Sequence, residues 1–85
     1  MFVYVDVYRK EQCEWCKVSM CINSRYVISI VPRTDEDGME YANLIMSKPV
    51  GVNFCIYDGV GGYNVKTAED WGKVCAYFDA AHYGV

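Results

Sequence analysis

The sequence predicts an α/β fold with the element order β-α-β-α-β-β-α, in which three helices cover a mixed sheet of four strands. Two observations support this class. Runs of β-branched and aromatic residues alternate with segments whose apolar residues recur at helical spacing. An Asp-Gly pair at residues 58–59 then separates two extended runs, which is a hairpin signal. Alternation followed by a hairpin and a last helix indicates a small sheet with helices packed on it.

The composition is that of one small folded domain spanning residues 1–85. The chain is 53% hydrophobic and 15% aromatic, which is sufficient for a core. Its net charge of -3 argues against a nucleic-acid partner, because such proteins present a basic face. No run approaches the roughly 20 apolar residues of a membrane span, and no secretory signal is visible. The five cysteines are an odd number, so they cannot all pair within one chain. Together with the missing signal, this number favours a reducing, cytoplasmic location without membrane partners.

The first half of the chain is predicted to form a β-α-β unit. Residues 2–8 have the composition of a strand. Residues 14–23 are predicted to be a short helix, because three of their apolar residues fall at i, i+3 and i+4. Residues 25–31 form a nearly continuous apolar run closed by Pro32, as expected for a parallel strand buried on both faces.

The second half is predicted to add a helix, a hairpin and a last helix. The helix would begin at Thr34, which can cap it, and end at Lys48-Pro49. Residues 52–57 and 60–65 would be the two strands of the hairpin. The last helix would follow a second capping motif that starts at Thr67. Its apolar residues recur at helical spacing: Trp71, Val74, Cys75 and Phe78.

The chemistry is predicted to lie in a C-x-x-C motif, residues 13–16, between the first strand and the first helix. A dithiol at such a junction in a cytosolic protein is typical of thiol–disulfide exchange. Cys13 would face the unpaired N–H groups and positive dipole end of the helix, and both lower the pKa of a thiol. Lys10 adds positive charge, whereas Glu14 opposes a second negative charge. We therefore predict that Cys13 is the nucleophile and Cys16 the resolving thiol.

The element order and these residues resemble a glutaredoxin, in particular the small glutaredoxins of large bacteriophages. The resemblance rests on the C-x-x-C, on Lys10 three residues before it, on Trp15 inside it, and on residues 61–63 (Gly-Gly-Tyr) after the hairpin. It covers essentially the whole chain and implies a thioredoxin fold. The family usually has C-P-Y-C, where this chain has a glutamate in place of the proline. It also has a cis-proline opening the third strand, where this chain has either Asn53 or Pro49.

The resemblance implies an enzyme, a glutathione-dependent thiol–disulfide oxidoreductase that reduces protein or mixed disulfides through Cys13 and Cys16. Glutathione would be the reducing co-substrate, and no bound cofactor is implied. Ribonucleotide reductase would be a protein client, and the protein would act as a monomer, in the host cytoplasm if a phage encodes it. The residues implied to bind glutathione are Lys10, Trp15, Val52, Asn53, Gly61, Gly62 and Asn64.

Two alternatives stay open. The first is a non-catalytic binding or inhibitor module, since fold alone does not fix function. The second is a zinc protein in which the C-x-x-C supplies two of four ligands. The other two ligands would have to come from residues that lack the short paired spacing of such sites, so we predict no metal: Cys21, Cys55, Cys75 and His82.

Overall fold

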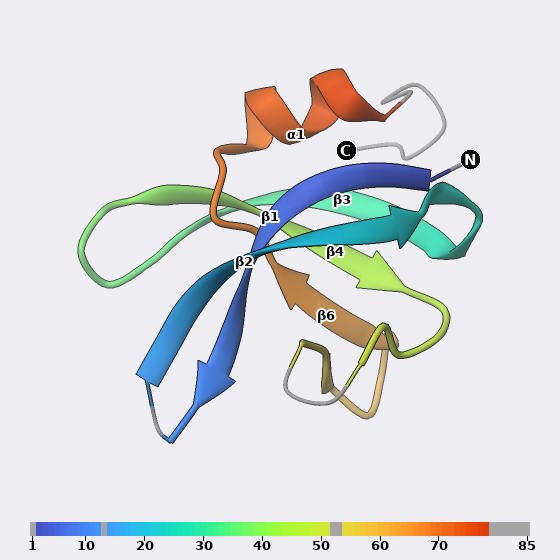
Figure 1. Ribbon diagram of the computed structural model, residues 1–85, viewed down its shortest axis with the longest axis horizontal. Coiled ribbons are helices and arrows are strands. Elements are labelled where there is room, and N and C mark those ends of the chain that lie inside the picture. Colours follow the sequence, from blue (N-terminus) through green and yellow to red (C-terminus); the bar gives the residue numbers. More distant parts are fainter. Residues whose placement is uncertain (1, 13, 52–53, 79–85) are drawn as a thin grey trace.

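The computed structural model describes residues 2–12, 14–51 and 54–78, and these residues form a mostly β architecture with one short helix (Figure 1). The expected thioredoxin-like α/β fold, with three helices over a four-stranded mixed sheet, is therefore wrong. The elements found in the described residues are β1 (Phe2–Glu11), β2 (Glu14–Asn23), a 3₁₀ turn (Ser24–Tyr26), β3 (Val27–Thr34), β4 (Glu40–Met46), β5 (Ile56–Tyr57), β6 (Tyr63–Lys66) and α1 (Trp71–Tyr77).

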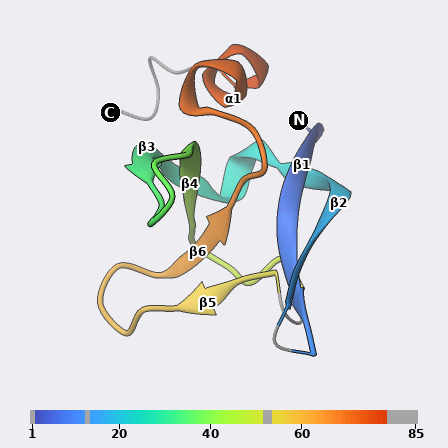
Figure 2. The ribbon, with the colours of Figure 1, turned by 90° about the vertical axis from the view of Figure 1, so that its left-hand side faces the viewer.

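The described strands form two antiparallel sheets. β1 and β2 make a long hairpin that closes at the pair Glu11–Glu14. The second sheet has the order β3-β4-β6-β5, and all of its pairs are antiparallel. A bridge between Val7 and Thr67 joins the hairpin to the end of β6. Figure 2 shows the hairpin standing beside the curved sheet, with α1 across the top and the β5–β6 loop projecting to the opposite side.

Residues 14–23 form a strand, and not the predicted helix, because their inward-facing residues are apolar at a period of two. Cys16, Val18, Met20 and Ile22 point to the same side of the hairpin. Val18 and Met20 pack against the core, and Ile22 is fully buried. A short isolated helix is marginal in water, whereas this strand pairs along its whole length with β1.

The predicted second helix is instead a turn followed by β4. Asp35 shapes the turn, because its Oδ1 accepts hydrogen bonds from the N–H groups of Asp37 and Met39, both at 2.9 Å. In β4, alternate residues face the core, which is the period of a strand and not of a helix. The fully buried residues of this strand are Ala42, Leu44 and Met46.

The first strand, the hairpin around Asp58-Gly59 and the last helix are confirmed, with shifted bounds. The predicted start of that helix is wrong. Asp70, and not Thr67, caps α1, and its Oδ1 accepts a hydrogen bond from the N–H of Lys73 at 2.8 Å. The strand predicted at residues 25–31 is β3, but it is an antiparallel edge strand, so most of its residues stay at least partly exposed.

One hydrophobic core lies between the two sheets and α1. The helix contributes Val74, and Phe78 follows it. Thr67 is the one fully buried polar residue in the described part of the chain, at 0% exposure. The strands supply the other core residues: Val5, Val7, Ile22, Val27, Ile30, Ala42, Leu44, Met46 and Val65.

Candidate binding pocket

The described part of the C-x-x-C motif, residues 14–16, lies at the start of β2 and not at a helix start. Residues 14–23 are a strand, so they offer no helix N-terminus to activate the predicted nucleophile, Cys13, which itself lies outside the described residues. Cys16 is half-buried on β2, opposite Arg9. It is a free thiol, so the expected redox-active disulfide on a thioredoxin fold is a further correction.

The other described cysteines are also free thiols. Burial raises the pKa of the Cys55 thiol, and the N–H of Val50, 3.4 Å from its Sγ, opposes that shift. Burial also raises the pKa of Cys75. Among the described residues, no group of three or more His, Cys, Asp or Glu side chains lies close enough to hold a metal ion.

The structure brings together part of the set implied to bind glutathione. Lys10 and Trp15 face each other across the hairpin, with the lysine Nζ 5.9 Å from the centre of the indole ring. Trp15 and Asn64 line the same pocket. All described peptide bonds are trans, including the one before Pro49. Val52 and Asn53 lie outside the described residues.

The paired glycines lie in the β5–β6 loop, where the carboxylate of Asp58 already uses their N–H groups. Its Oδ1 accepts hydrogen bonds from Val60, Gly61 and Gly62 at 2.9, 2.7 and 3.0 Å. Its Oδ2 accepts one from Nδ2 of Asn64 at 3.0 Å. The bond from Asn64 and those from the loop N–H groups lower the pKa of Asp58 to about 2. The chain's own carboxylate thus takes the donors that glutathione would need.

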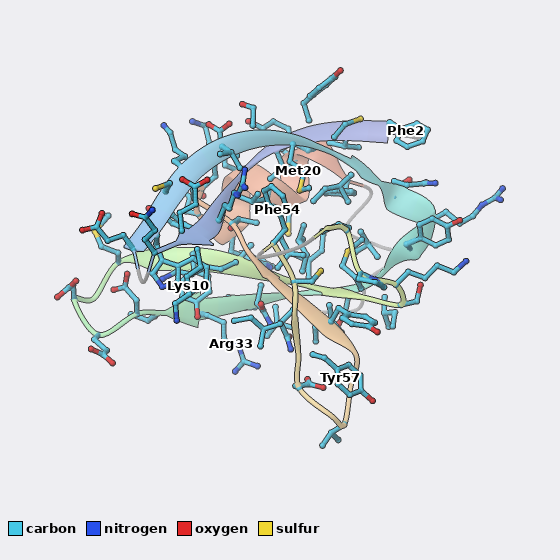
Figure 3. All side chains as sticks on the ribbon, turned by 60° about the horizontal axis from the view of Figure 1, so that its bottom comes forward. Phe2, Lys10, Met20, Arg33, Phe54 and Tyr57 are labelled. Carbon is cyan, nitrogen blue, oxygen red and sulfur yellow. The ribbon has the colours of Figure 1, made fainter. Side chains whose placement is uncertain are left out.

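A pocket of about 290 Å³ lies between the hairpin and the face of the β4–β6 sheet that points away from the core. Asn43 and Lys66 are directly opposite each other in this sheet, and their neighbours Leu44 and Val65 face inward. Figure 3 shows Phe54 lying among the strands, between the hairpin and the sheet. The pocket is lined by Trp15, Tyr41, Asn43, Phe54, Ile56, Asn64 and Lys66.

A chain of hydrogen bonds fixes which groups the pocket offers. The ionised Asp58 only accepts hydrogen bonds, so Asn64 must turn its Nδ2 toward it and present its Oδ1 on the other side. Nδ2 of Asn43 donates to that oxygen at 2.7 Å. The Oδ1 of Asn43 has no partner among the described residues. It is therefore an acceptor that a ligand in the pocket could use.

Cationic side chains lie over aromatic rings in and beside the pocket. Nζ of Lys66 lies 4.7 Å from the ring centre of Tyr41 and 5.3 Å from that of Tyr8, within cation–π range. The Arg9 guanidinium lies 5.3 Å from the ring centre of Phe54. The Lys66 ammonium forms no salt bridge with any described carboxylate, so its N–H groups are available as donors.

Sequence reasoning found Trp15 and Asn64 but missed the other residues of the pocket. The missing signal was the alternation in residues 41–44, Tyr-Ala-Asn-Leu, which places the tyrosine and the asparagine on one face of a strand. Assigning this segment to a helix hid that face. The residues that sequence reasoning missed are Tyr41, Asn43, Phe54, Ile56 and Lys66.

With the thioredoxin fold excluded, the glutaredoxin resemblance loses its structural support. The oxidoreductase activity, glutathione and ribonucleotide reductase stay predictions that the described structure does not test. None of the described helices is long and apolar enough to cross a membrane. Comparison of the chain with protein-family models, with curated proteins and with solved structures found no match.

Proposed function

We propose that this protein is a binding module that holds an extended segment of a partner protein in the pocket between the hairpin and the β4–β6 sheet. The observation that carries the proposal is the arrangement of polar groups there. Oδ1 of Asn43, oriented through Asn64 by Asp58, is a fixed acceptor. Lys66, whose backbone pairs with that of Asn43 in the sheet, carries an ammonium that is a donor.

One acceptor beside one donor is complementary to a peptide group. Each peptide unit carries one N–H and one C=O, and both must find partners when they are buried. The N–H would donate to Asn43, and the C=O would accept from Lys66. Pockets that bind ligands combine apolar and aromatic walls with a few fixed polar groups. Trp15, Phe54 and Ile56 supply such walls, and the volume of about 290 Å³ suits one apolar side chain of the partner.

The acidic balance of the whole chain favours a polypeptide over a nucleic acid, although Lys66 lines the pocket and Arg9 lies over its Phe54 wall. A nucleobase also carries adjacent donors and acceptors, but its backbone brings phosphates, whose binding depends on lysine and arginine. The ionised Asp58 belongs to the same hydrogen-bond chain as the pocket asparagines. The chain as a whole has a net charge of -3. The proposed ligand is therefore a segment of a protein.

Panning of a phage-displayed library of random peptides against the intact protein tests this proposal. Peptides recovered on the wild type are synthesised, and their affinities are measured by isothermal titration calorimetry. Asn43→Leu and Phe54→Ala are expected to weaken binding by about tenfold or more, the equivalent of about 1.4 kcal/mol. Phe2→Ala is the matched control for Phe54, because Phe2 is 68% exposed and lies outside the pocket. A ¹⁵N–¹H spectrum of each variant verifies that it is folded.

Three outcomes would overturn the proposal. They are the recovery of no peptide, binding that Asn43→Leu leaves unchanged, and tighter binding of an oligothymidylate than of any peptide. Cys13→Ser and Cys16→Ser separate the binding module from the thiol enzyme. A binding module keeps its peptide affinity in both variants, whereas a glutaredoxin loses glutathione-dependent reduction of a mixed disulfide in Cys13→Ser.

A further inference from the structure

The pocket continues into a second hollow on the side of the β3–β4 turn. The second hollow has a volume of about 480 Å³ and shares Trp15, Tyr41 and Lys66 with the first. The rest of its wall is the β3–β4 turn, residues 34–37. We call the two hollows together the groove. One end of the groove is apolar, at Phe54 and Ile56, and the other end is formed by the turn.

The turn end of the groove carries uncompensated negative charge. Asp35, Glu36 and Asp37 line it, and Lys66 is the one cationic residue among its lining residues. Asp35 uses Oδ1 to hold the turn together. Glu36 and Asp37 are exposed and form no salt bridge with any described cation. Lys66 lies over its two tyrosine rings, outside salt-bridge distance of the turn.

We infer that the partner segment carries an arginine or lysine whose charge meets Glu36 and Asp37 while an apolar neighbour fills the Phe54 end. This inference rests on the proposed function and names the chemistry of its ligand. Opposite charges across an interface select the partner and speed its association. Arginine suits this end better than lysine, because its planar group both binds carboxylates in a bidentate manner and stacks on aromatic rings. Trp15 and Tyr41 supply those rings.

The peptides recovered by panning are expected to be enriched in arginine or lysine at one fixed offset from an apolar residue. A synthetic peptide with that residue is compared with the same peptide carrying glutamate there. Glu36→Lys and Asp37→Lys should each lower the affinity for the basic peptide by about threefold to tenfold. Both variants should restore affinity for the acidic peptide. At about 1 M sodium chloride, where the screening length is about 3 Å, the differences should disappear.

Glu40→Lys is the matched control, since it changes the net charge by the same amount as Glu36→Lys. Glu40 is exposed, four residues from Glu36, and lines hollows outside the groove. It should leave the affinity of the basic peptide within about twofold of the wild type. If Glu40→Lys weakens binding as much as Glu36→Lys does, the effect belongs to net charge and the inference is overturned.

The failures of the two proposals are distinguishable. If peptides bind in a way that depends on Asn43 and Phe54 but show no preference for a basic residue, the acidic end has no role and only this inference fails. The same holds if Glu36→Lys binds the basic peptide as tightly as the wild type. If no recovered peptide depends on Asn43 and Phe54, the proposed function itself fails.

Discussion

Replacing Thr67 with valine tests how much one buried hydroxyl, which bonds β4 and the segment before α1, contributes to stability. Thr67 is fully buried, and its backbone forms the bridge to Val7. Its Oγ1 accepts a hydrogen bond from the N–H of Ala42 at 2.9 Å. The hydroxyl proton goes to the carbonyl of Ala42 at 2.8 Å or of Glu69 at 2.7 Å. Valine has nearly the same shape, so the change removes these bonds with little effect on packing.

The expected loss of unfolding free energy is about 2 kcal/mol. Two hydrogen bonds contribute about 1 kcal/mol each. The N–H of Ala42 retains only a contact with the carbonyl of Glu69 at 3.4 Å, and an undersatisfied buried donor adds to the cost. The methyl group that replaces the hydroxyl gains about 0.8 kcal/mol from burial, which offsets part of it.

Urea unfolding followed by tryptophan fluorescence measures this loss. With a urea dependence of about 1 kcal/mol per molar, as in small domains, the midpoint should fall by about 2 M. Thr67→Ser is the control, because it keeps the hydroxyl and removes one methyl group, at a cost of about 1 kcal/mol. The valine variant should therefore unfold at lower urea than the serine variant. The reverse order, or a valine variant as stable as the wild type, would refute the role given to the hydroxyl.

Two further predictions concern the β5–β6 loop. Gly62→Ala should unfold at lower urea than Gly61→Ala, because a Cβ at Gly62 (φ +118°) would lie 2.7 Å from the carbonyl oxygen of Met46, whereas the nearest atom at Gly61 is 3.4 Å away; equal midpoints would contradict this. In a ¹⁵N–¹H pH titration, the amide signals of Gly61 and Gly62 should move with a midpoint of about 2, and a midpoint at the ordinary value of 3.8 would show that Asp58 is not held by the loop. Since the folded pKa is lowered, the stabilisation is complete above the unfolded pKa and is lost as the pH falls through about 2.

The elements that could be predicted from the sequence are those whose signals are local. The β-branched run of β1, the Asp58-Gly59 pair and the apolar spacing of α1 each specify their own conformation. Residues 14–23 fit two periods at once. Val18, Cys21 and Ile22 match a helix, and Met20 with its alternate neighbours matches a strand. The C-x-x-C motif favoured the helix in the prediction. Pairing with β1 along the whole segment, from Asn23 to Glu14, instead makes it a strand.

The capping motifs were also misleading, because a local motif does not show whether its threonine is buried in the core. The spacing T-x-x-D occurs at both Thr34 and Thr67, yet neither threonine caps a helix. Thr34 ends β3, and Thr67 lies in the core. In the second motif the aspartate, Asp70, is the cap. A threonine whose hydroxyl bonds strand carbonyls can have the same local sequence as one that caps a helix. Only the tertiary fold determines which of the two roles it has.

The candidate pocket was predictable only in fragments, because it depends on strand register. Trp15 and Asn64 were found through a family resemblance. The same resemblance implied that Gly61 and Gly62 bind glutathione, whereas Gly62 approaches the backbone of Met46. The neighbourhood of Asn43 and Lys66, however, exists only because β4 pairs with β6 in one register. A shift of β6 by one residue would turn Lys66 to the core face and away from Asn43.

Several cations of this acidic chain lie over aromatic rings and, among the described residues, not against carboxylates. In the described residues, Arg9, Lys10, Lys48 and Lys66 each lie over a ring, and only Arg9 of these also forms a salt bridge. A cation over a ring keeps its charge, but among the described residues none of these cations forms a salt bridge with the acids of the β3–β4 turn. The acids of the β3–β4 turn therefore remain uncompensated although lysine lines the same groove. A cation supplied by a bound segment would pair with these carboxylates, which is the reason for proposing a basic ligand.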